Sequence, residues 1–214
     1  MDILMIASPK TYIDTYSDIL EKSGLKIAGI ETESQSVARA LVPLTVKEPI
    51  LIADMDAFKT ALVMVQNGTL QFTSSVPIAG NTFTQALSKA LSITPGDAEK
   101  LKHQVGFTNT VEYPNLKIQM LPALQDLAAE ITNILKFHYD HHEDHIGSLI
   151  LTGGGAKLQH KAEALEPMLE QYAPLKVTVA NPLEHIPNFK ETELGPYEAL
   201  SFTTAIGLAM WEIK

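Results

Sequence analysis

The alternation of hydrophobic and polar residues predicts a chain of short strands and amphipathic helices. Short apolar runs predict strands, and apolar residues repeated at the helical period predict helices. Strands are expected at residues 3–7, 26–30, 50–54, 60–65, 70–76, 148–151 and 176–179. Helices are expected at residues 9–24, 33–41, 82–91, 95–103, 121–141, 158–172 and 197–211.

A hairpin and the order of the later elements indicate the fold class, which is α/β. Asn67-Gly68 separates two of the strands, and both residues tolerate the positive φ angles of a tight hairpin turn. Three consecutive strands are followed by helix, strand, helix, strand and helix, which is the element order of the ribonuclease H-like fold. Actin-like nucleotide-binding proteins and a class of nucleases are both built on that fold, so the fold alone leaves the function open.

Composition narrows the function classes. The 214 residues carry a formal net charge of -9 and no dense Lys/Arg run, which argues against a nucleic-acid partner. The absence of cysteine excludes a disulfide framework and a thiolate zinc site, so a reducing, cytoplasmic location is expected. The most apolar stretches, residues 148–152 and 200–211, are shorter than the roughly 20 residues that span a bilayer. Neither a signal peptide nor a membrane anchor is expected.

The segment Leu151-Thr-Gly-Gly-Gly-Ala156 is the strongest candidate for ligand chemistry, and we call Gly153, Gly154 and Gly155 the glycine segment. It lies where a predicted strand passes to a predicted helix. Successive glycines allow a backbone to lie flush against a flat ligand, and the following helix would offer free N–H groups. A tight strand-to-helix turn explains one or two glycines but seldom three, so the pattern favours a nucleotide site.

A carboxylate is predicted at the same end of the sheet. Asp54 ends one strand and Thr60 opens the next, so the loop of residues 55–59 would face the glycine segment. An aspartate at a strand end can orient a hydrated Mg²⁺ ion or a water, and loop amides can cradle phosphate. The alternative is an aspartate that only opens a turn.

Two further pairs of residues are candidates for ligand contacts. Glu99 and Lys102 lie one helical turn apart, so both side chains could reach the hydroxyls of a ribose. The alternative is a surface ion pair of little energetic weight. Gly80 and Asn81 precede a predicted helix, where the alternative to a ligand role is a plain helix cap formed by Asn81.

A row of histidines lies near the end of the longest predicted helix. His138, His141, His142 and His145 are spaced so that three of them could share one face and bind a divalent metal. The competing interpretation is a solvated helix end, where histidines favour the negative end of the helix dipole. We favour the helix end, because no carboxylate or thiolate framework surrounds these residues in the sequence.

Five segments together resemble the type IV pilus assembly protein PilM family and, more distantly, the bacterial actin-like cell-division protein FtsA. They are residues 50–60 (ILIADMDAFKT), 76–84 (VPIAGNTFT), 97–102 (DAEKLK), 151–158 (LTGGGAKL) and 205–209 (AIGLA). Their order and spacing match along nearly the whole chain. No single segment is decisive, but five in register are hard to obtain by chance.

The resemblance implies an actin-like ATPase fold with an incomplete first lobe and a complete second lobe. Residues 1–48 would be the remainder of the first lobe, including part of its extra subdomain. Residues 49–214 would be the second lobe, with a small inserted helical subdomain at about 82–120. Met1 leads directly into an apolar run, from which we expect that the sequence begins inside a fold.

The resemblance also implies contacts to ATP and Mg²⁺. Asp54 and its loop would form the second phosphate motif, the glycine segment the adenosine motif, and Glu99 with Lys102 the ribose contacts. The implied nucleotide contacts are Asp54, Thr60, Gly80, Asn81, Glu99, Lys102, Gly153, Gly154, Gly155 and Lys157. Asp54 is also the candidate for positioning Mg²⁺ or a water.

Two departures from the family pattern bear on activity. Asp56 stands where the family's phosphate loop usually has glycine, and it places a Cβ and a negative charge where phosphate oxygens would approach. The family's first phosphate hairpin would precede residue 1. Phosphoryl transfer depends on positioning and charge stabilisation from both sides, so we expect neither tight ATP binding nor efficient hydrolysis by this chain alone. ATPase activity is expected at most in the full-length protein.

The leading hypothesis is a cytoplasmic scaffold of the type IV pilus inner-membrane platform, peripheral to that membrane through protein partners. The resemblance implies that it binds a short N-terminal peptide of a PilN-like membrane protein, and other platform proteins. Apolar surface left by a missing lobe would favour a homo-oligomer. One alternative is an active actin-like ATPase or cell-division filament protein. Another is a two-metal nuclease with Asp54 as a ligand, which the net acidity disfavours.

Overall fold

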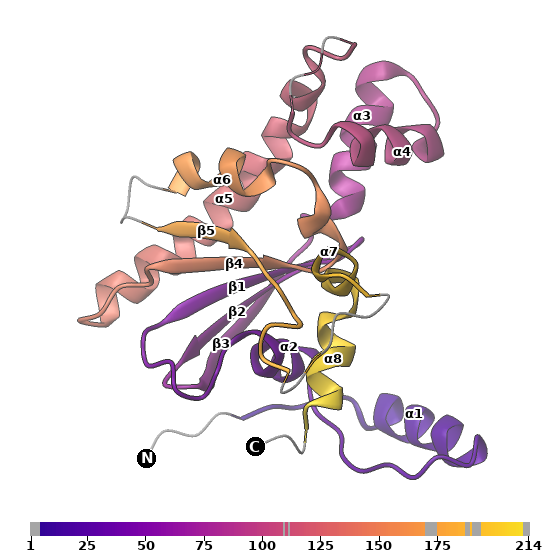
Figure 1. Ribbon diagram of the computed structural model, residues 1–214, viewed down its shortest axis with the longest axis vertical. Helices are drawn as coiled ribbons and strands as arrows, with labels where there is room; N and C mark the ends of the chain where they lie inside the picture. Colours follow the sequence, from indigo (N-terminus) through magenta and orange to yellow (C-terminus); the bar gives the residue numbers. More distant parts are fainter. Residues whose placement is uncertain are drawn as a thin grey trace.

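The protein is built on one sheet with helices on both sides (Figure 1), and the computed structural model describes residues 5–108, 110, 112–169, 175–186, 189 and 194–211. The strands are β1 (Ile50–Met55), β2 (Thr60–Gln66), β3 (Thr69–Val76), β4 (Ser148–Thr152) and β5 (Lys176–Val179). The helices are α1 (Lys10–Lys22), α2 (Glu33–Leu41), α3 (Gly80–Leu91), α4 (Pro95–Val105), α5 (Leu116–His141), α6 (Lys161–Leu169), α7 (Pro196–Ala199) and α8 (Thr203–Ala209). Short 3-10 turns are η1 (Gly154–Lys157) and η2 (Leu200–Phe202).

The five strands form a mixed sheet in the order β3-β2-β1-β4-β5 (Figure 1). β1, β2 and β3 pair antiparallel, whereas β4 is parallel to β1 and β5 is parallel to β4. Asn67 and Gly68 have φ angles of 53° and 67°, so the predicted tight turn between β2 and β3 is confirmed. The α/β class and the ribonuclease H-like order of elements are confirmed as well.

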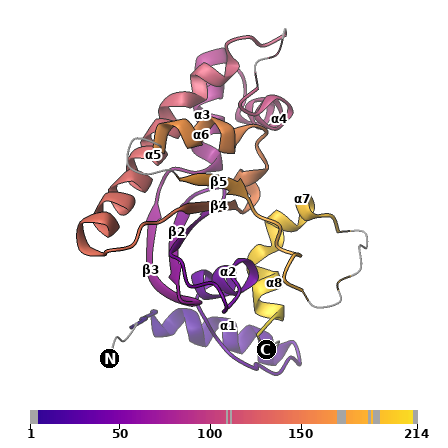
Figure 2. The ribbon, with the colours of Figure 1, turned by 60° about the vertical axis from the view of Figure 1, so that its left-hand side comes forward.

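Helices cover both faces of the sheet, because each strand turns alternate side chains to opposite sides. Leu51, Ala53 and Met55 of β1 join the larger apolar core with side chains of α3, α5 and α6. Ile52 faces the other way and joins a smaller core with Val63 and residues of α2. Figure 2 shows α5 and α6 on one side of the strands and α2 and α8 on the other.

The contact between α2 and α8 explains a glycine in one of the five segments. A Cβ on Gly207 would lie 1.9 Å from the carbonyl oxygen of Ser36, so only glycine fits there. Arg39 of α2 donates to the carbonyl oxygen of Gly207 at 2.9 Å and to the carboxylate of Glu31. The guanidinium carbon of Arg39 also lies 5.1 Å from the ring centroid of Trp211. Close packing and a polar clamp therefore fix these two helices against each other.

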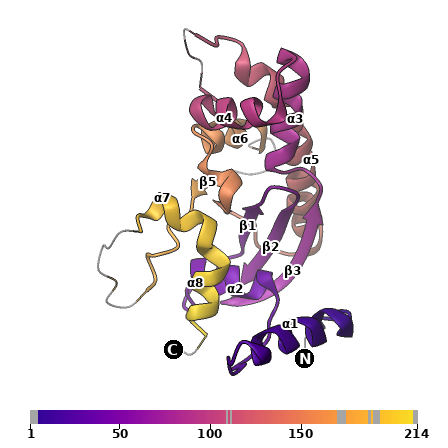
Figure 3. The same cartoon turned by 90° about the vertical axis from the view of Figure 1, so that its right-hand side faces the viewer.

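Two of the predicted strands are wrong. Residues 5–7 of the first and residues 26–30 of the second lie in no strand, and residues 3 and 4 fall outside the described part of the chain. A strand exists only with a ladder partner, and among the described residues the five strands of the sheet pair only with one another. The helix between these two segments, α1, has no buried residue and extends away from the sheet (Figure 3).

Apart from the last one, the predicted helices are right in place, and most of them differ only at their ends. α5 begins at Leu116 and contains Pro122, which the prediction placed near the start of the helix. α6 begins at Lys161 rather than residue 158, and residues 170–172 of that prediction lie outside the described part. In the described ranges, no helix is long and apolar enough to cross a membrane.

The single helix predicted for residues 197–211 is wrong. It is replaced by α7, η2 and α8 in succession. The hydroxyl of Thr203 donates to the carbonyl of Leu200 at 3.1 Å and shares a hydrogen bond with the hydroxyl of Thr152 at 2.7 Å. Such side-chain bonds compete with helical backbone bonds and favour a break.

The predicted lobe boundary between residues 48 and 49 stays a prediction. Residues 33–41 precede that boundary and form α2. Val37, Ala40 and Leu41 of this helix are buried in the smaller core against the sheet. α2 is thus tied to the sheet by apolar packing.

Candidate functional site

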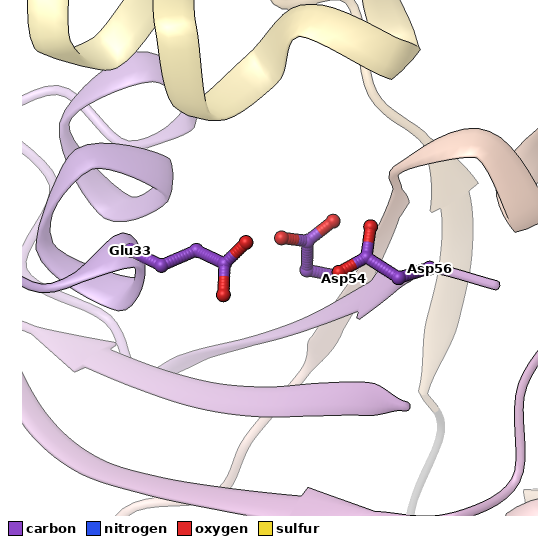
Figure 4. A group of neighbouring side chains, drawn as sticks. All are labelled: Glu33, Asp54 and Asp56. Carbon is purple, nitrogen blue, oxygen red and sulfur yellow. The ribbon is translucent and has the colours of Figure 1, made fainter. Parts of the chain in front are cut away.

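Three carboxylates lie together at the end of β1. Asp54 is the second-last residue of β1, Asp56 follows in the loop, and Glu33 is the first residue of α2. One oxygen of each lies within 4.8 Å of the others, and Figure 4 shows Glu33 extending toward the two aspartates. We call this group the acidic cluster. Mg²⁺ prefers carboxylate and water oxygens, so the cluster has suitable donor atoms for it.

Burial and mutual repulsion favour protonation within the acidic cluster. Asp54 is 3% exposed, and burial, followed by the charges of Asp56 and Glu33, raises its pKa to about 7 against the opposing effect of Lys59. Burial, and then Glu33, also raise the pKa of Asp56. A divalent cation would relieve this repulsion, which is the electrostatic argument for a cation at this place.

Glu33 is a member of the site that the sequence did not indicate. The side chain of Gln35 accepts from the backbone N–H of Thr32 at 3.1 Å, and this capping contact fixes the start of α2. Glu33 also pairs with Lys59 of the β1–β2 loop at 2.8 Å. An acidic residue in a first helical turn is common for electrostatic reasons, so the sequence alone carries no distinctive signal for Glu33.

The glycine segment lies directly on the end of β1. A Cβ on Gly153, whose φ is +80°, would lie 2.6 Å from Oδ1 of Asp54. A Cβ on Gly155 would lie 2.9 Å from the Cβ of Met55. Packing therefore requires these two glycines, as a tight turn would. Gly154 has no atom nearer than 3.9 Å on that side, so the turn does not account for it.

The backbone after the glycine segment differs from the prediction. Its N–H groups belong to the 3-10 turn η1, and the next α-helix begins only at Lys161. The expected row of free N–H groups at an α-helix start is therefore wrong for this position. The tyrosine hydroxyl of Tyr197 donates to the carbonyl of Lys157 at 2.7 Å and holds the end of this turn.

α3 holds the loop between β1 and β2. The N–H of Gly80 donates to the carbonyl of Asp56 at 2.9 Å, and the N–H of Asn81 donates to the carbonyl of Ala57 at 2.9 Å. The first amides of a helix lack partners within the helix, and here the loop carbonyls supply them. Ala79 is the N-cap residue, so the alternative of an Asn81 cap is wrong.

Glu99 and Lys102 are paired, and the lysine is buried. Nζ of Lys102 donates to Glu99 at 2.7 Å, to the hydroxyl of Thr84 at 2.9 Å and to the carbonyl of Gly80 at 3.1 Å. These bonds use all the ammonium hydrogens. Lys102 is 3% exposed, so a plain surface ion pair is wrong for it. Burial acts to raise the pKa of Glu99, but its hydrogen bonds outweigh burial and lower that pKa.

A pocket of about 290 Å³ joins the loop, α3, α4 and the glycine segment. It is lined by Asp56, Ala57, Gly80, Asn81, Glu99, Lys102, His103, Gly154, Gly155, Lys157, Leu158 and Ser201. Of the nucleotide contacts implied by the resemblance, only Asp54, Thr60 and Gly153 are absent from this lining. Thr60 is buried, and its hydroxyl donates to the carbonyl of Ile78 at 2.5 Å.

The pocket has the size and donor set for the nucleoside part of a nucleotide. Its volume lies just below the roughly 300–1,000 Å³ typical of sites for drug-sized ligands. Gly154 offers open backbone, and the side chain of Glu99 is 42% exposed and can accept from a hydroxyl. The acidic cluster beside it fits a hydrated divalent cation better than it fits bare phosphate.

The histidine row does not form a ligand set. α5 ends at His141, so the helical spacing does not continue to His145. Aromatic stacking divides the row into the pairs Phe137–His141, His138–His142 and Tyr139–His145. Burial, and then His142, lower the pKa of His138 against the effect of Asp144, which contacts it at 3.1 Å. Within the described ranges, the acidic cluster is the group of residues with metal-ligand geometry.

The sheet order and the placement of the site define a class of protein. A carboxylate at the end of β1 and the glycine segment after the parallel β4 lie side by side. MreB5 of Spiroplasma citri, solved bound to AMPPNP, aligns with a TM-score of 0.70 at 15% identity over 96% of this chain and 65% of that chain. The fold is therefore that of the actin-like ATPases.

The chain belongs to the type IV pilus assembly protein PilM family, whose model matches residues 1–213. The PilM-PilN type IV pilus biogenesis complex aligns with a TM-score of 0.76 at 21% identity, over 96% of this chain and 59% of that chain. Cell division protein FtsA of Streptococcus pneumoniae serotype 2 is 21% identical over 202 residues, which are 84% of this chain and 44% of FtsA. The chain thus spans less than two thirds of the length of each relative, and the resemblance seen in the sequence is confirmed.

Proposed function

We propose that the protein is a scaffold of the type IV pilus inner-membrane platform. The observation that carries this proposal is the family match along nearly the whole chain. The similarity to a chain of the PilM-PilN complex supports a PilN-like membrane protein as partner. We infer that a short N-terminal peptide of that partner, together with other platform proteins, holds the protein at the cytoplasmic face of the membrane.

Peptide binding tests the scaffold proposal directly. The full-length protein that contains this chain is titrated into a fluorescent N-terminal peptide of the PilN-like protein from the same organism, and anisotropy reports binding. We expect saturable binding, with a scrambled peptide of the same composition as the control. Equal binding of the two peptides, or of neither, would contradict the proposal.

The nucleotide part of the proposal is a degenerate adenine-nucleotide site. Gly154 would face the base, Glu99 would accept from a ribose hydroxyl, and the acidic cluster would hold Mg²⁺ through water or directly. Mg²⁺ would supply the positive charge that phosphate oxygens need. Asp56 places a carboxylate in the pocket, and Lys102 has its donors engaged, so we propose weak binding.

Isothermal titration of the full-length protein with ATP and Mg²⁺ tests this site. Asp56→Gly removes a Cβ and a negative charge, so we expect affinity to rise by about tenfold. Gly154→Val fills the open side of the glycine segment and should abolish binding, whereas Gly147→Val, at a position where an added Cβ meets no atom within 4 Å, should not. If neither the wild type nor Asp56→Gly binds, the nucleotide part is wrong, while the peptide test decides the scaffold part independently.

An active ATPase or filament-forming protein is the second candidate. The acidic cluster favours it, because Glu33 and Asp54 are carboxylates that can hold Mg²⁺ or orient a water. Phosphate release by the full-length protein is the measurement. Turnover that is lost in both Glu33→Gln and Asp54→Asn would favour catalysis over scaffolding.

A further inference from the structure

A second, apolar groove lies between α5 and the outer strands of the sheet. Its volume is about 530 Å³. It is lined by Leu62, Met64, Gln66, Gln71, Phe72, Ser74, Val76, Glu130, Asn133, Ile134, Phe137, His138 and His142. No residue of this lining belongs to the pocket of about 290 Å³ beside the glycine segment, which we call the nucleotide-type pocket, so the two cavities are separate. We call it the α5–β3 groove.

The groove exposes large apolar side chains on both of its sides. Phe72 of β3 is 40% exposed, and Phe137 of α5 is 63% exposed. Between them lie Leu62 and Met64, which are buried residues of β2. Apolar surface that is concave and flanked by exposed aromatic side chains is typical of a protein-binding surface.

The strand that borders the groove is an edge strand. β3 is the outermost member of the sheet, and among the described residues it pairs with β2 alone. Backbone N–H and C=O groups on its outer side therefore have no ladder partner. An unpaired strand edge next to a helix and an apolar groove is the arrangement that accepts an extended peptide as an additional strand.

Polar groups in the groove indicate the chemistry of such a peptide. Glu130 contributes a carboxylate to the lining, and the chain as a whole carries a net charge of -9, so a basic side chain complements it. His138 is 2% exposed, and its Nε2 lies 3.1 Å from the carboxylate of Asp144. When the neutral ring carries its proton on Nε2, where it can donate to Asp144, its Nδ1 is an acceptor. This Nδ1 has no hydrogen-bond partner in the described structure.

We propose that the α5–β3 groove binds an extended peptide of a protein partner, which pairs with β3 as an additional strand. Alternate apolar side chains of the peptide enter the groove, because side chains of a strand alternate between its two sides. A basic residue of the peptide lies near Glu130. This interaction is additional to the nucleotide-type pocket and does not depend on its occupancy.

Selection from a random peptide library displayed on phage tests the proposal. The full-length protein is the bait, and its Phe137→Ser variant is selected in parallel. We expect wild type alone to enrich peptides with alternating apolar residues, a basic residue and no proline, since proline cannot join a ladder. Absence of enrichment over the Phe137→Ser variant would overturn the proposal.

Matched variants then locate the bound peptide by fluorescence anisotropy. An enriched synthetic peptide should bind at least about tenfold more weakly to Phe137→Ser. Tyr139→Ser should bind like wild type, because this side chain is similarly exposed, at 59%, and does not line the groove. Glu130→Lys should reverse the preference from a basic to an acidic peptide. Peptides that bind all these variants equally would refute the assignment.

Hydrogen exchange distinguishes strand addition from simple occupancy of the groove. Amides of β3 should exchange more slowly when the selected peptide is bound, because a new ladder protects them. Unchanged exchange at β3 in the saturated complex would overturn the strand geometry. Thermal unfolding of each variant without peptide serves as the control, and the midpoints of Phe137→Ser and Tyr139→Ser should match that of wild type.

Discussion

Asp54 is buried beside two other carboxylates, so its ionisation costs folding free energy. Its pKa of about 7 lies above the ordinary value of 3.8, so the unfolded chain loses the carboxyl proton of Asp54 at a lower pH than the folded chain does. The free energy of unfolding should therefore fall as the pH rises between these two values. We expect Asp54→Asn to raise the free energy of unfolding above pH 7 by about 1–4 kcal/mol and to reduce this pH dependence. Urea denaturation below and above pH 7 measures both, and an equally steep dependence in the variant would contradict the prediction.

Lys161 is a buried cation beneath the glycine segment. It is 1% exposed, its Nζ donates to the carbonyl of Gly155 at 3.1 Å, and it lies 4.5 Å from the ring centroid of Phe83. Burial, and then the charge of Lys102, lower its pKa from 10.5 to about 7. The unfolded chain keeps the ammonium proton of Lys161 to a higher pH than the folded chain does. The contribution of Lys161 to the free energy of unfolding should therefore rise as the pH increases between these values.

Removal of the Lys161 charge tests the direction of this pH dependence of stability. Lys161→Met keeps the length of the side chain, and we expect it to raise the free energy of unfolding at neutral pH by on the order of a few kcal/mol. It should also abolish the rise in stability above pH 7. Lys176→Met, at an exposed position, is the control and should change little. Thermal unfolding over a pH series is the measurement, and a destabilised Lys161→Met would show that its hydrogen bond outweighs its burial.

At the scale of elements, the contact of α2 with α8 sets propensity against packing. Alanine in place of a helical glycine favours a helix by about 1 kcal/mol, so propensity alone predicts that Gly207→Ala stabilises the protein. A Cβ at that position would lie 1.9 Å from the carbonyl oxygen of Ser36, so packing predicts the opposite sign. We expect a loss of about 1–3 kcal/mol in the free energy of unfolding.

Urea denaturation of Gly207→Ala measures that balance. Gly147→Ala is the matched control, because a Cβ there meets no atom within 4 Å. Its free energy of unfolding should stay within about 0.5 kcal/mol of wild type. A Gly207→Ala variant as stable as wild type would mean that α2 and α8 can move apart at little cost.

At the scale of the whole molecule, α1 presents an apolar face without partners among the described residues. Tyr16 and Ile19 are 68% and 55% exposed, and no residue of this helix is buried. We expect the 214-residue chain to self-associate through this face as its concentration rises. Sedimentation velocity should show Ile19→Glu shifted toward monomer, whereas Thr11→Glu, on another face of the helix, should behave like wild type. A monomeric wild type would contradict the prediction.

Several features follow from the sequence by itself, because local rules decide them. Asn67-Gly68 specifies a tight turn through backbone angles that most residues avoid, and the short apolar runs on either side of it indicate the strands. Parallel strands bring their ends to one edge of a sheet, so Asp54 and the glycine segment were predicted to be neighbours, and a Cβ on Gly153 would indeed meet Asp54. Five short segments in register also indicated the family.

Other features were decided only by the tertiary structure, because they depend on which distant elements meet. Glu33 joins Asp54 and Asp56 only because α2 packs on the sheet, and the hydrogen bonds of Lys102 depend on how α3 meets α4. Residues 26–30 have a strand-like pattern, but no described strand lies beside them to complete a ladder. Periodicity records which side of an element is apolar, whereas the identity of the partner on that side is a property of the packed molecule.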